Sequence, residues 1–210
     1  MKNWELNFDE YVTGTVVTPC GWAYLTASET GVVACFWPLV EEDIEALRSH
    51  PDKVAAGCGP HIKLKQAAEA LLAYFSGDYT SLQNVDVDSR KLSLWQRMVY
   101  YSVRSIPLGE VRSYKWVAAE CGKPGGARAV GQALAVNPFP LFVPCHRVIH
   151  SDGRTGNFTS NGKIPGSILK KLLLHWEKGE ECALEEMSRL IRENRGSLAM
   201  RSEERRVGKE

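Results

Sequence analysis

The sequence lacks the features that mark several large classes of protein. No run among its 210 residues approaches the length of about 18 apolar residues that a membrane-spanning helix needs. The first residues, MKNWELNFDEYV, hold acids and aromatics where a secretory signal would need an apolar segment. We therefore expect an intracellular protein, in the cytoplasm or in the nucleus or nucleoid, with no membrane partner.

Close cysteine pairs are also missing. The six cysteines include no Cys-x-x-Cys motif, which argues against a disulfide framework in a chain of this length. Half of a zinc-like spacing is present in Cys58-Gly-Pro-His61, and Cys20 and Cys35 could in principle complete it. With no second close pair, we expect free thiols, no metal ion and no cofactor.

The chain has little net charge, +1, but its charges are unevenly distributed. Residues 1–89 hold 5 Lys and Arg against 13 Asp and Glu, residues 90–154 hold 10 against 3, and residues 155–210 hold 11 against 9. Residues 90–154 therefore form a basic island of the kind that faces nucleic-acid phosphates. The alternative is that these charges scatter over a solvated surface.

The first half of the chain has the pattern of an α+β fold. Three segments between residues 11 and 38, YVTGTVVTP, GWAYLTA and GVVACFWP, are rich in β-branched and aromatic residues and are separated by Cys-Gly and Glu-Thr-Gly. They predict three antiparallel strands. Apolar residues at helical spacing predict helices at about 41–49 and 61–75, followed by a connector or short strand at 82–89.

Helical patterns dominate the rest. We expect helices from about residue 92 to 105, from 114 to 120, from 127 to 136 and from 183 to 192. The expected class is α+β, with an N-terminal domain (1–89), a mainly helical, winged-helix-like domain containing a helix-turn-helix (90–178), and a charged, partly disordered extension (179–210).

The two short helices at 114–120 and 127–136 have the layout of a helix-turn-helix. The second, ARAVGQALAV, consists largely of small apolar residues, which fit closely against a groove wall but contact few base edges. The pattern indicates DNA binding directed by shape or by a lesion, with Arg128 as the one long probe. The alternative is an ordinary pair of helices joined by a tight turn.

Residues 143–150, VPCHRVIH, place a candidate nucleophile in this half. A nucleophilic thiol needs a pKa below its free value of about 8.5, and His146 and Arg147 directly follow Cys145. Adjacent side chains diverge, so His146 would act through one water, oriented by a carboxylate from Asp152 or Glu177. The alternatives are a structural cysteine, and a Cys-His hydrolase for which no nucleophile elbow is present.

The stretch RAVGQALAVNPFPLFVPCHRVI, with IPLGEVRSY before it and GNF after it, closely resembles the O6-alkylguanine-DNA alkyltransferases, the methylated-DNA–protein-cysteine methyltransferase family, over about residues 93–177. The resemblance implies a monomer that binds double-stranded DNA through the minor groove and flips an O6-alkylguanine out of the duplex. It implies a direct, irreversible, stoichiometric transfer of the alkyl or methyl group to the cysteine.

The resemblance also implies roles for matching positions. Cys145 is the acceptor, His146 deprotonates it through a water, Glu177 orients the imidazole, and Asn137 is a hinge before the active-site turn. The implied DNA-binding residues are Arg128, which fills the space left by the flipped base, Tyr114, Ala127, Ala129 and Gly131. The implied pocket residues are Tyr114, Pro140, Val148, Phe158 and Ser160.

Two departures from the family pattern concern the pocket. Phe158 stands where the family commonly has tyrosine, and TSNGKIPGS makes the loop before Lys170 several residues longer. Both bear on the range of alkyl groups and the rate. A non-enzymatic, alkyltransferase-like lesion-binding protein is the alternative function, but that group lacks the acceptor cysteine.

Overall fold

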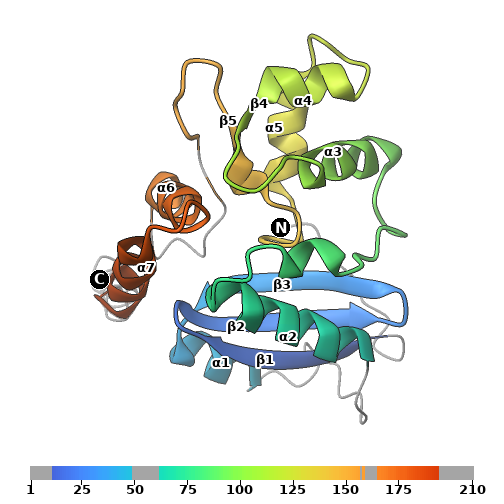
Figure 1. Cartoon of the computed structure of the whole chain (residues 1–210). Helices are drawn as coiled ribbons and strands as arrows, with labels where there is room; N and C mark the ends of the chain where they lie inside the picture. The colour runs from blue at the N-terminus through green and yellow to red at the C-terminus, as the bar shows by residue number, and fades with distance from the viewer. Residues whose placement is uncertain (1–10, 49–61, 157, 159–164, 194–210) are drawn as a thin grey trace, which may run out of the picture.

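The computed structural model describes residues 11–48, 62–156, 158 and 165–193. Its first elements are strands β1 (Val12–Thr18), β2 (Gly21–Ser28) and β3 (Gly31–Leu39), which form an antiparallel sheet in the order β1-β2-β3 (Figure 1). Thr18 pairs with Gly21 and Ser28 with Gly31, so both connections are tight turns. The predicted three-stranded meander is confirmed.

Helices α1 (Glu41–Arg48) and α2 (Ile62–Phe75) follow the sheet, close to their predicted bounds. Helix α2 lies across one face of the sheet (Figure 1). Its buried residues recur at helical spacing, which is why the sequence pattern located it; they are Ala67, Leu71, Tyr74 and Phe75. The connector then forms the 3₁₀ helix η3 (Ser81–Asn84) and one bridge between Val87 and Val32.

Three helices form the upper part of the molecule in Figure 1, α3 (Leu94–Arg104), α4 (Tyr114–Glu120) and α5 (Ala127–Ala135). A capping box formed by Ser93 and Gln96 starts α3, and the Ser113 hydroxyl accepts from the Trp116 N–H at the start of α4. The predicted helix pair, α4 and α5, is present within one residue of its expected bounds.

A short parallel pair of strands was not predicted. Strand β4 (Arg112–Ser113) pairs with β5 (Val148–Ile149), with Arg112 opposite Val148 and Ser113 opposite Ile149. Two residues are too few to show an alternating pattern in the sequence. The pairing places the start of α4 beside the chain that follows Cys145.

Helices α6 (Gly166–Trp176) and α7 (Glu181–Glu193) pack side by side (Figure 1). Helix α7 starts two residues before the predicted one and buries Ala183, Met187 and Ile191. Part of the predicted charged extension is therefore a packed helix, and its remainder lies outside the described residues.

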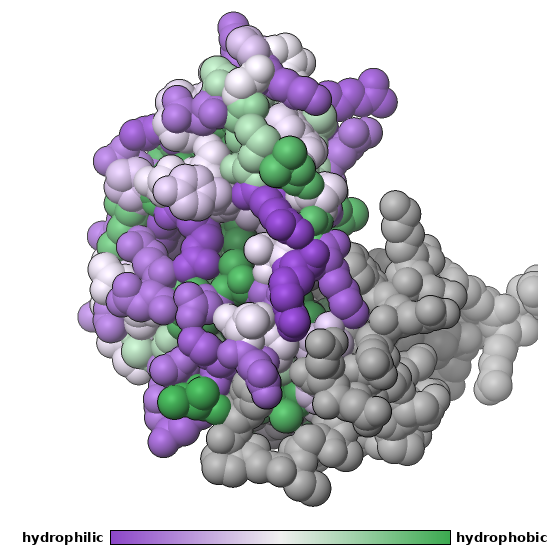
Figure 2. All heavy atoms as spheres, turned by 90° about the vertical axis from the view of Figure 1, so that its right-hand side faces the viewer, coloured by the Kyte–Doolittle hydropathy of each residue, from purple (hydrophilic) through white to green (hydrophobic). Residues whose placement is uncertain are grey.

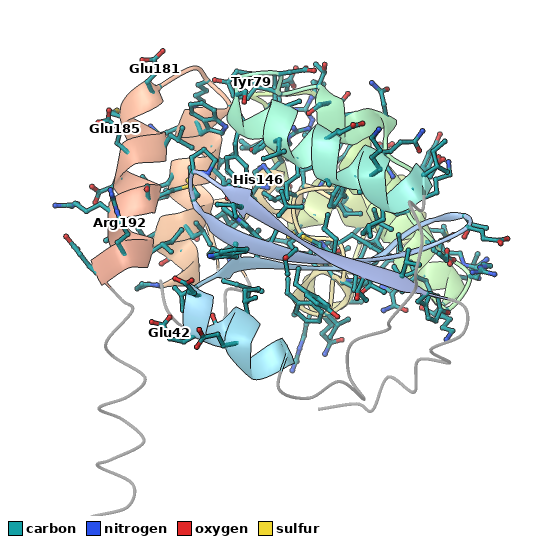
Figure 3. The ribbon with its side chains drawn as sticks, turned by 90° about the horizontal axis from the view of Figure 1, so that it is seen from below. Glu42, Tyr79, His146, Glu181, Glu185 and Arg192 are labelled. Carbon is teal, nitrogen blue, oxygen red and sulfur yellow. The ribbon has the colours of Figure 1, made fainter. Side chains whose placement is uncertain are left out.

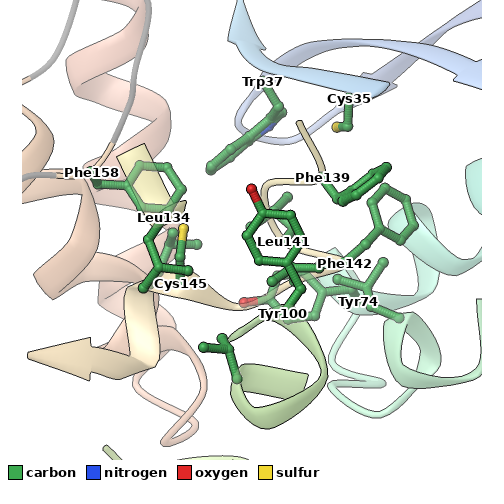
Figure 4. Packing of buried hydrophobic residues seen from close by; sticks show 14 of the residues in the cluster. Cys35, Trp37, Tyr74, Tyr100, Leu134, Phe139, Leu141, Phe142, Cys145 and Phe158 are labelled. Carbon is green, nitrogen blue, oxygen red and sulfur yellow. The ribbon is translucent and has the colours of Figure 1, made fainter. Parts of the chain in front are cut away.

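One contiguous hydrophobic core joins elements from both halves of the chain. Figure 4 shows Cys35 and Trp37 of β3 facing the segment that carries Phe139 and Leu141. The backbone N–H of Cys35 also donates to the carbonyl of Pro138 at 2.8 Å. The predicted α+β class is confirmed, and the proposed boundary near residue 89 stays a prediction.

The surface on the α3 side is mostly hydrophilic, with single apolar side chains among the polar ones (Figure 2). Scattered exposed apolar side chains are normal for globular proteins. Among the described residues, no helix has the length and apolar character required to cross a bilayer.

Candidate active site

The candidate nucleophile lies on a short 3₁₀ helix, η4 (Cys145–Arg147), whose three side chains are all buried. The segment before it is tightly turned: Val143 N–H donates to Phe139 carbonyl at 2.8 Å, and Leu141 has a positive φ of 74°. A positive φ is unfavourable for a branched residue, so the surrounding packing must hold this turn in place.

Asn137 fixes both sides of the turn. Its side-chain oxygen accepts from the Phe139 N–H at 3.0 Å, and its amide nitrogen donates to the Val143 carbonyl at 3.1 Å. The side chain also hydrogen-bonds Cys145. This geometry fits the hinge position implied by the resemblance, since one side chain joins the end of α5 to the cysteine.

Cys145 is buried among hydrophobic residues, including Leu134 and Phe158 (Figure 4). Burial raises the pKa of its thiol, although the Asn137 hydrogen bond and the positive charge of Lys170 act in the opposite direction. The expectation that the Cys145 thiol has a lowered pKa is therefore wrong for this structure, because desolvation of the thiolate dominates. A resting thiol of this kind needs a base before it can react.

His146 and Glu177 meet as the sequence predicted. His146 Nε2 lies 2.7 Å from Glu177 Oε1, and both side chains are almost fully excluded from solvent. Burial lowers the pKa of His146, while the Glu177 charge acts in the opposite direction. His146 Nδ1 is buried and makes no hydrogen bond to any described residue. An ionised Glu177 requires the proton on Nε2, which leaves Nδ1 as an acceptor.

Arg147 is bound to the same carboxylate. Its Nε donates to Glu177 Oε2 at 2.8 Å, its Nη2 to Oε1 at 2.9 Å, and its Nη1 to the Ile106 carbonyl at 2.8 Å. Burial acts to raise the pKa of Glu177, but His146 and Arg147 outweigh it and lower that pKa to about 2. Glu177 is therefore a permanent anion at neutral pH.

Lys170 is a buried lysine from α6 on the other side of the cysteine. Its Nζ donates to the Val148 carbonyl, lies 3.5 Å from the Tyr114 hydroxyl and 5.5 Å from the centre of the Tyr114 ring. Burial lowers its pKa to about 8. A cation beside Cys145 favours the thiolate over the thiol.

Tyr114 starts α4 and stands where that helix meets the chain after β5. Its ring lies 5.1 Å from the His150 ring, centre to centre, at 50°. Gly156 adopts a φ of +68°, and a Cβ there would lie 3.1 Å from the Tyr114 hydroxyl and 3.2 Å from His150 Nε2. A side chain at residue 156 would therefore displace Tyr114.

The predicted DNA-binding residues lie at the start of α5. Arg128 is exposed, and Ala127, Ala129 and Gly131 are half-buried. A Cβ on Gly131 would lie 3.9 Å from a ring carbon of Tyr114, so α5 passes close to the tyrosine. Small side chains on this helix therefore lie beside one long, exposed cationic side chain.

The chain has known relatives. A family model described as 6-O-methylguanine DNA methyltransferase, DNA binding domain, matches residues 94–179. A methylated-DNA–protein-cysteine methyltransferase of Mycobacterium bovis is 38% identical over 166 residues, which are 78% of this chain and 90% of that relative. The chain belongs to the methylated-DNA–protein-cysteine methyltransferase family.

Solved structures agree with that membership. The crystal structure of Mycobacterium tuberculosis O6-methylguanine methyltransferase matches with a TM-score of 0.61 and 28% identity, over 81% of this chain and 94% of that one. The structure of Mycobacterium tuberculosis OGT in complex with DNA matches with a TM-score of 0.59 and 27% identity, over 84% and 98%.

The remaining pocket candidates of this methyltransferase-family chain are only partly described. Pro140 and Val148 are buried beside the cysteine turn, and the Phe158 ring lies 6.4 Å from the His146 ring. Ser160 lies outside the described residues. Asp152, the other candidate carboxylate, is exposed and bound to Arg154 at 2.7 Å, so it does not orient His146.

No metal site accompanies these residues in the described part of the chain, where His, Cys, Asp and Glu never group in threes. Cys20 and Cys35 are buried free thiols. Cys58 and His61, which carry the zinc-like spacing, lie outside the described residues.

Sequence reasoning did not assign the observed roles of Arg147 and Lys170, and it did not identify Tyr74 as part of the site. Arg147 was considered as a cation for the thiol, yet its guanidinium binds Glu177. Lys170 stands beside the exposed Lys171, so the sequence gives no sign of which lysine is buried. The hydroxyl of Tyr74, in α2, donates to Glu177 Oε1 at 3.2 Å across 103 residues of sequence. The spacing of Tyr74 three residues after Leu71 could have indicated that it is buried, but not that it reaches Glu177.

Proposed function

We propose that this chain repairs DNA by transferring an alkyl group from guanine O6 to Cys145, once per protein molecule. The observation that carries the proposal is the buried arrangement of a cysteine, a histidine with one free ring nitrogen and an ionised Glu177. Family membership supports the same reaction.

The proton of Cys145 leaves through one water to His146 Nδ1. His146 is neutral at pH 7, because burial lowers its pKa, and it can therefore accept a proton. The resulting imidazolium lies 2.7 Å from the Glu177 carboxylate, which stabilises it. Lys170 stabilises the thiolate from the other side.

The alkyl transfer is one displacement. The sulfur electron pair forms a bond to the alkyl carbon while the bond from that carbon to O6 breaks, and the guanine keeps the electron pair and takes up a proton. The product is a thioether, which water does not hydrolyse back to a thiol. One molecule of protein therefore repairs one lesion.

DNA is the partner that the helix pair favours. The small residues of α5 suit close contact with a minor groove, where readout of sequence is not needed. Arg128 is exposed at the start of α5 and long enough to occupy the space left by a flipped base. Tyr114 lies between α5 and Lys170, and the family resemblance implies that it lines the pocket for the flipped guanine.

The test is mass spectrometry after incubation with a duplex carrying one O6-methylguanine. The peptide containing Cys145 should gain the mass of one methylene, and Cys145→Ser should gain none. Cys182→Ser is the matched control, since Cys182 is an exposed free thiol on α7, and it should behave as the wild type. Tight lesion binding without mass gain would instead support the non-enzymatic lesion-binding protein.

A further inference from the structure

The carboxylate of Glu177 is held from three directions. Its Oε1 lies 2.7 Å from His146 Nε2, 2.9 Å from Arg147 Nη2 and 3.2 Å from the Tyr74 hydroxyl, while Oε2 accepts from Arg147 Nε. Two of these neighbours belong to η4, but Tyr74 comes from α2, which lies on the N-terminal sheet. The N-terminal part of the chain therefore contacts the proposed proton relay.

Tyr74 is well placed to donate. It is 1% exposed, and burial together with the negative charge of Glu177 raises its pKa well above the usual value. The phenol consequently keeps its proton over the whole working range of pH, and the carboxylate remains its acceptor. A hydrogen bond to a charged group in a dry environment is stronger than one between neutral groups.

Donors that share one carboxylate oxygen compete for its negative charge. Each hydrogen bond to Glu177 Oε1 lowers the basicity that remains for the others. The Tyr74 hydroxyl therefore weakens the pull of Glu177 on His146, and it also restrains the carboxylate in the position from which it meets Nε2.

We propose that Tyr74 is a positioning residue for alkyl transfer: its hydroxyl holds Glu177 against His146 and limits how strongly that carboxylate favours the protonated imidazole. The inference rests on the proposed function, in which neutral His146 accepts the proton of Cys145. It extends the reaction's machinery beyond the segment that the family's DNA-binding-domain model matches, residues 94–179.

Among the described residues, few charged or titratable groups lie around His146. Lys170 comes from α6, and Glu177 is the residue that caps the C-terminal end of that helix. Arg147 and Cys145 come from η4, and Tyr74 acts from α2 through Glu177. Arg147 and Lys170 are cations that disfavour imidazolium, and Glu177 favours it. Removing the Tyr74 hydroxyl leaves all of these charges in place and changes only the strength of the Glu177 interaction.

A matched control exists in the same aromatic cluster. The Tyr79 ring packs edge-on against Tyr74 at 6.2 Å and against Trp176 at 5.2 Å, and Figure 3 shows it close to α7. Tyr79 makes no hydrogen bond to Glu177. Tyr79→Phe therefore removes a hydroxyl from the cluster without removing a hydrogen bond to the carboxylate.

The experiment compares the pH dependence of single-turnover methyl transfer in the wild type, Tyr74→Phe and Tyr79→Phe. The acid limb of the profile is the pH range in which protonation of His146 slows methyl transfer. In Tyr74→Phe this limb should move to higher pH by roughly 0.5 to 1 unit, because Glu177 then attracts the His146 proton more strongly. At a fixed pH on that limb, transfer should slow by roughly threefold to tenfold. In the resting protein, the NMR titration of the His146 ring should shift in the same direction.

Each outcome decides between the alternatives. An acid limb that stays in place, or moves to lower pH, overturns the inference even if Tyr74→Phe is slower or less stable, since a structural role alone would not move it. A limb that moves equally in Tyr79→Phe also overturns it. A wild-type protein that takes up no methyl group refutes the proposed function itself, and this result is distinguishable because it precedes any comparison of variants.

Discussion

Replacing Glu177 by glutamine should destabilise the fold strongly. The change keeps the size of the side chain but leaves Arg147, 3% exposed, without its counter-charge. Breaking a buried ion pair by removing one partner costs about 3–5 kcal/mol. The lowering of the Glu177 pKa from 4.5 to about 2, which the same contacts cause, corresponds to about 3 kcal/mol.

The same reasoning predicts that the contribution of Glu177 to the free energy of unfolding depends on pH. The folded-state pKa of Glu177 lies below its unfolded value, so its contribution to stability is complete above about pH 4.5 and is lost as the pH falls towards about 2. The free energies of unfolding of the wild type and Glu177→Gln should therefore differ most at neutral pH and become similar in acid.

The assay is denaturant unfolding followed by circular dichroism from pH 7 to pH 3. Asp152→Asn is the matched control, because it makes the same chemical change at an exposed ion pair and should leave the free energy of unfolding at its wild-type value. Glu177→Gln could lower the free energy of unfolding by less than about 1 kcal/mol at pH 7, or its difference from the wild type could stay constant down to pH 3. Either result would refute the assignment of Glu177 as a buried anion.

Two further outcomes test the proposed binding surface and pocket. Arg128→Ala should slow repair in duplex DNA by roughly tenfold or more while changing repair in single strands little, because base replacement matters only in a duplex; rates measured on both substrates check this, and equal losses would contradict it. Gly156→Ala and Gly153→Ala should each lower the free energy of unfolding by about 1 kcal/mol, because both positions have positive φ. Only Gly156→Ala should slow methyl transfer, because only its Cβ meets Tyr114.

Much of the fold followed from local patterns in the sequence. The strands of the sheet and helices α2, α4 and α5 appeared within about one residue of their expected bounds, since alternation and helical spacing extend over whole elements. The pair β4 and β5 was missed because two residues carry no period, and its pairing depends on chain segments 36 residues apart.

Some residues of the candidate site could be located from the sequence, and others depend on how distant segments pack. Cys145, His146 and Asn137 lie in one short stretch, and a family resemblance located them together with Glu177. The Tyr74 contact with Glu177 could not be foreseen, because the two residues are 103 positions apart and only the packing of α2 brings them together. The raised pKa of Cys145 also depends on burial, which a dipeptide sequence does not specify.

Helix α6 carries both Lys170 and, at its C-terminal end, Glu177. Seven residues of α-helix make almost two full turns and a rise of about 10 Å, so the ammonium and the carboxylate project from nearly the same face at a fixed separation. Leu169, Leu173 and Trp176 anchor that face in the core. The fixed separation of the two charges therefore does not depend on the length of the chain before Gly166, and the longer segment that the family resemblance predicts there is compatible with an intact relay.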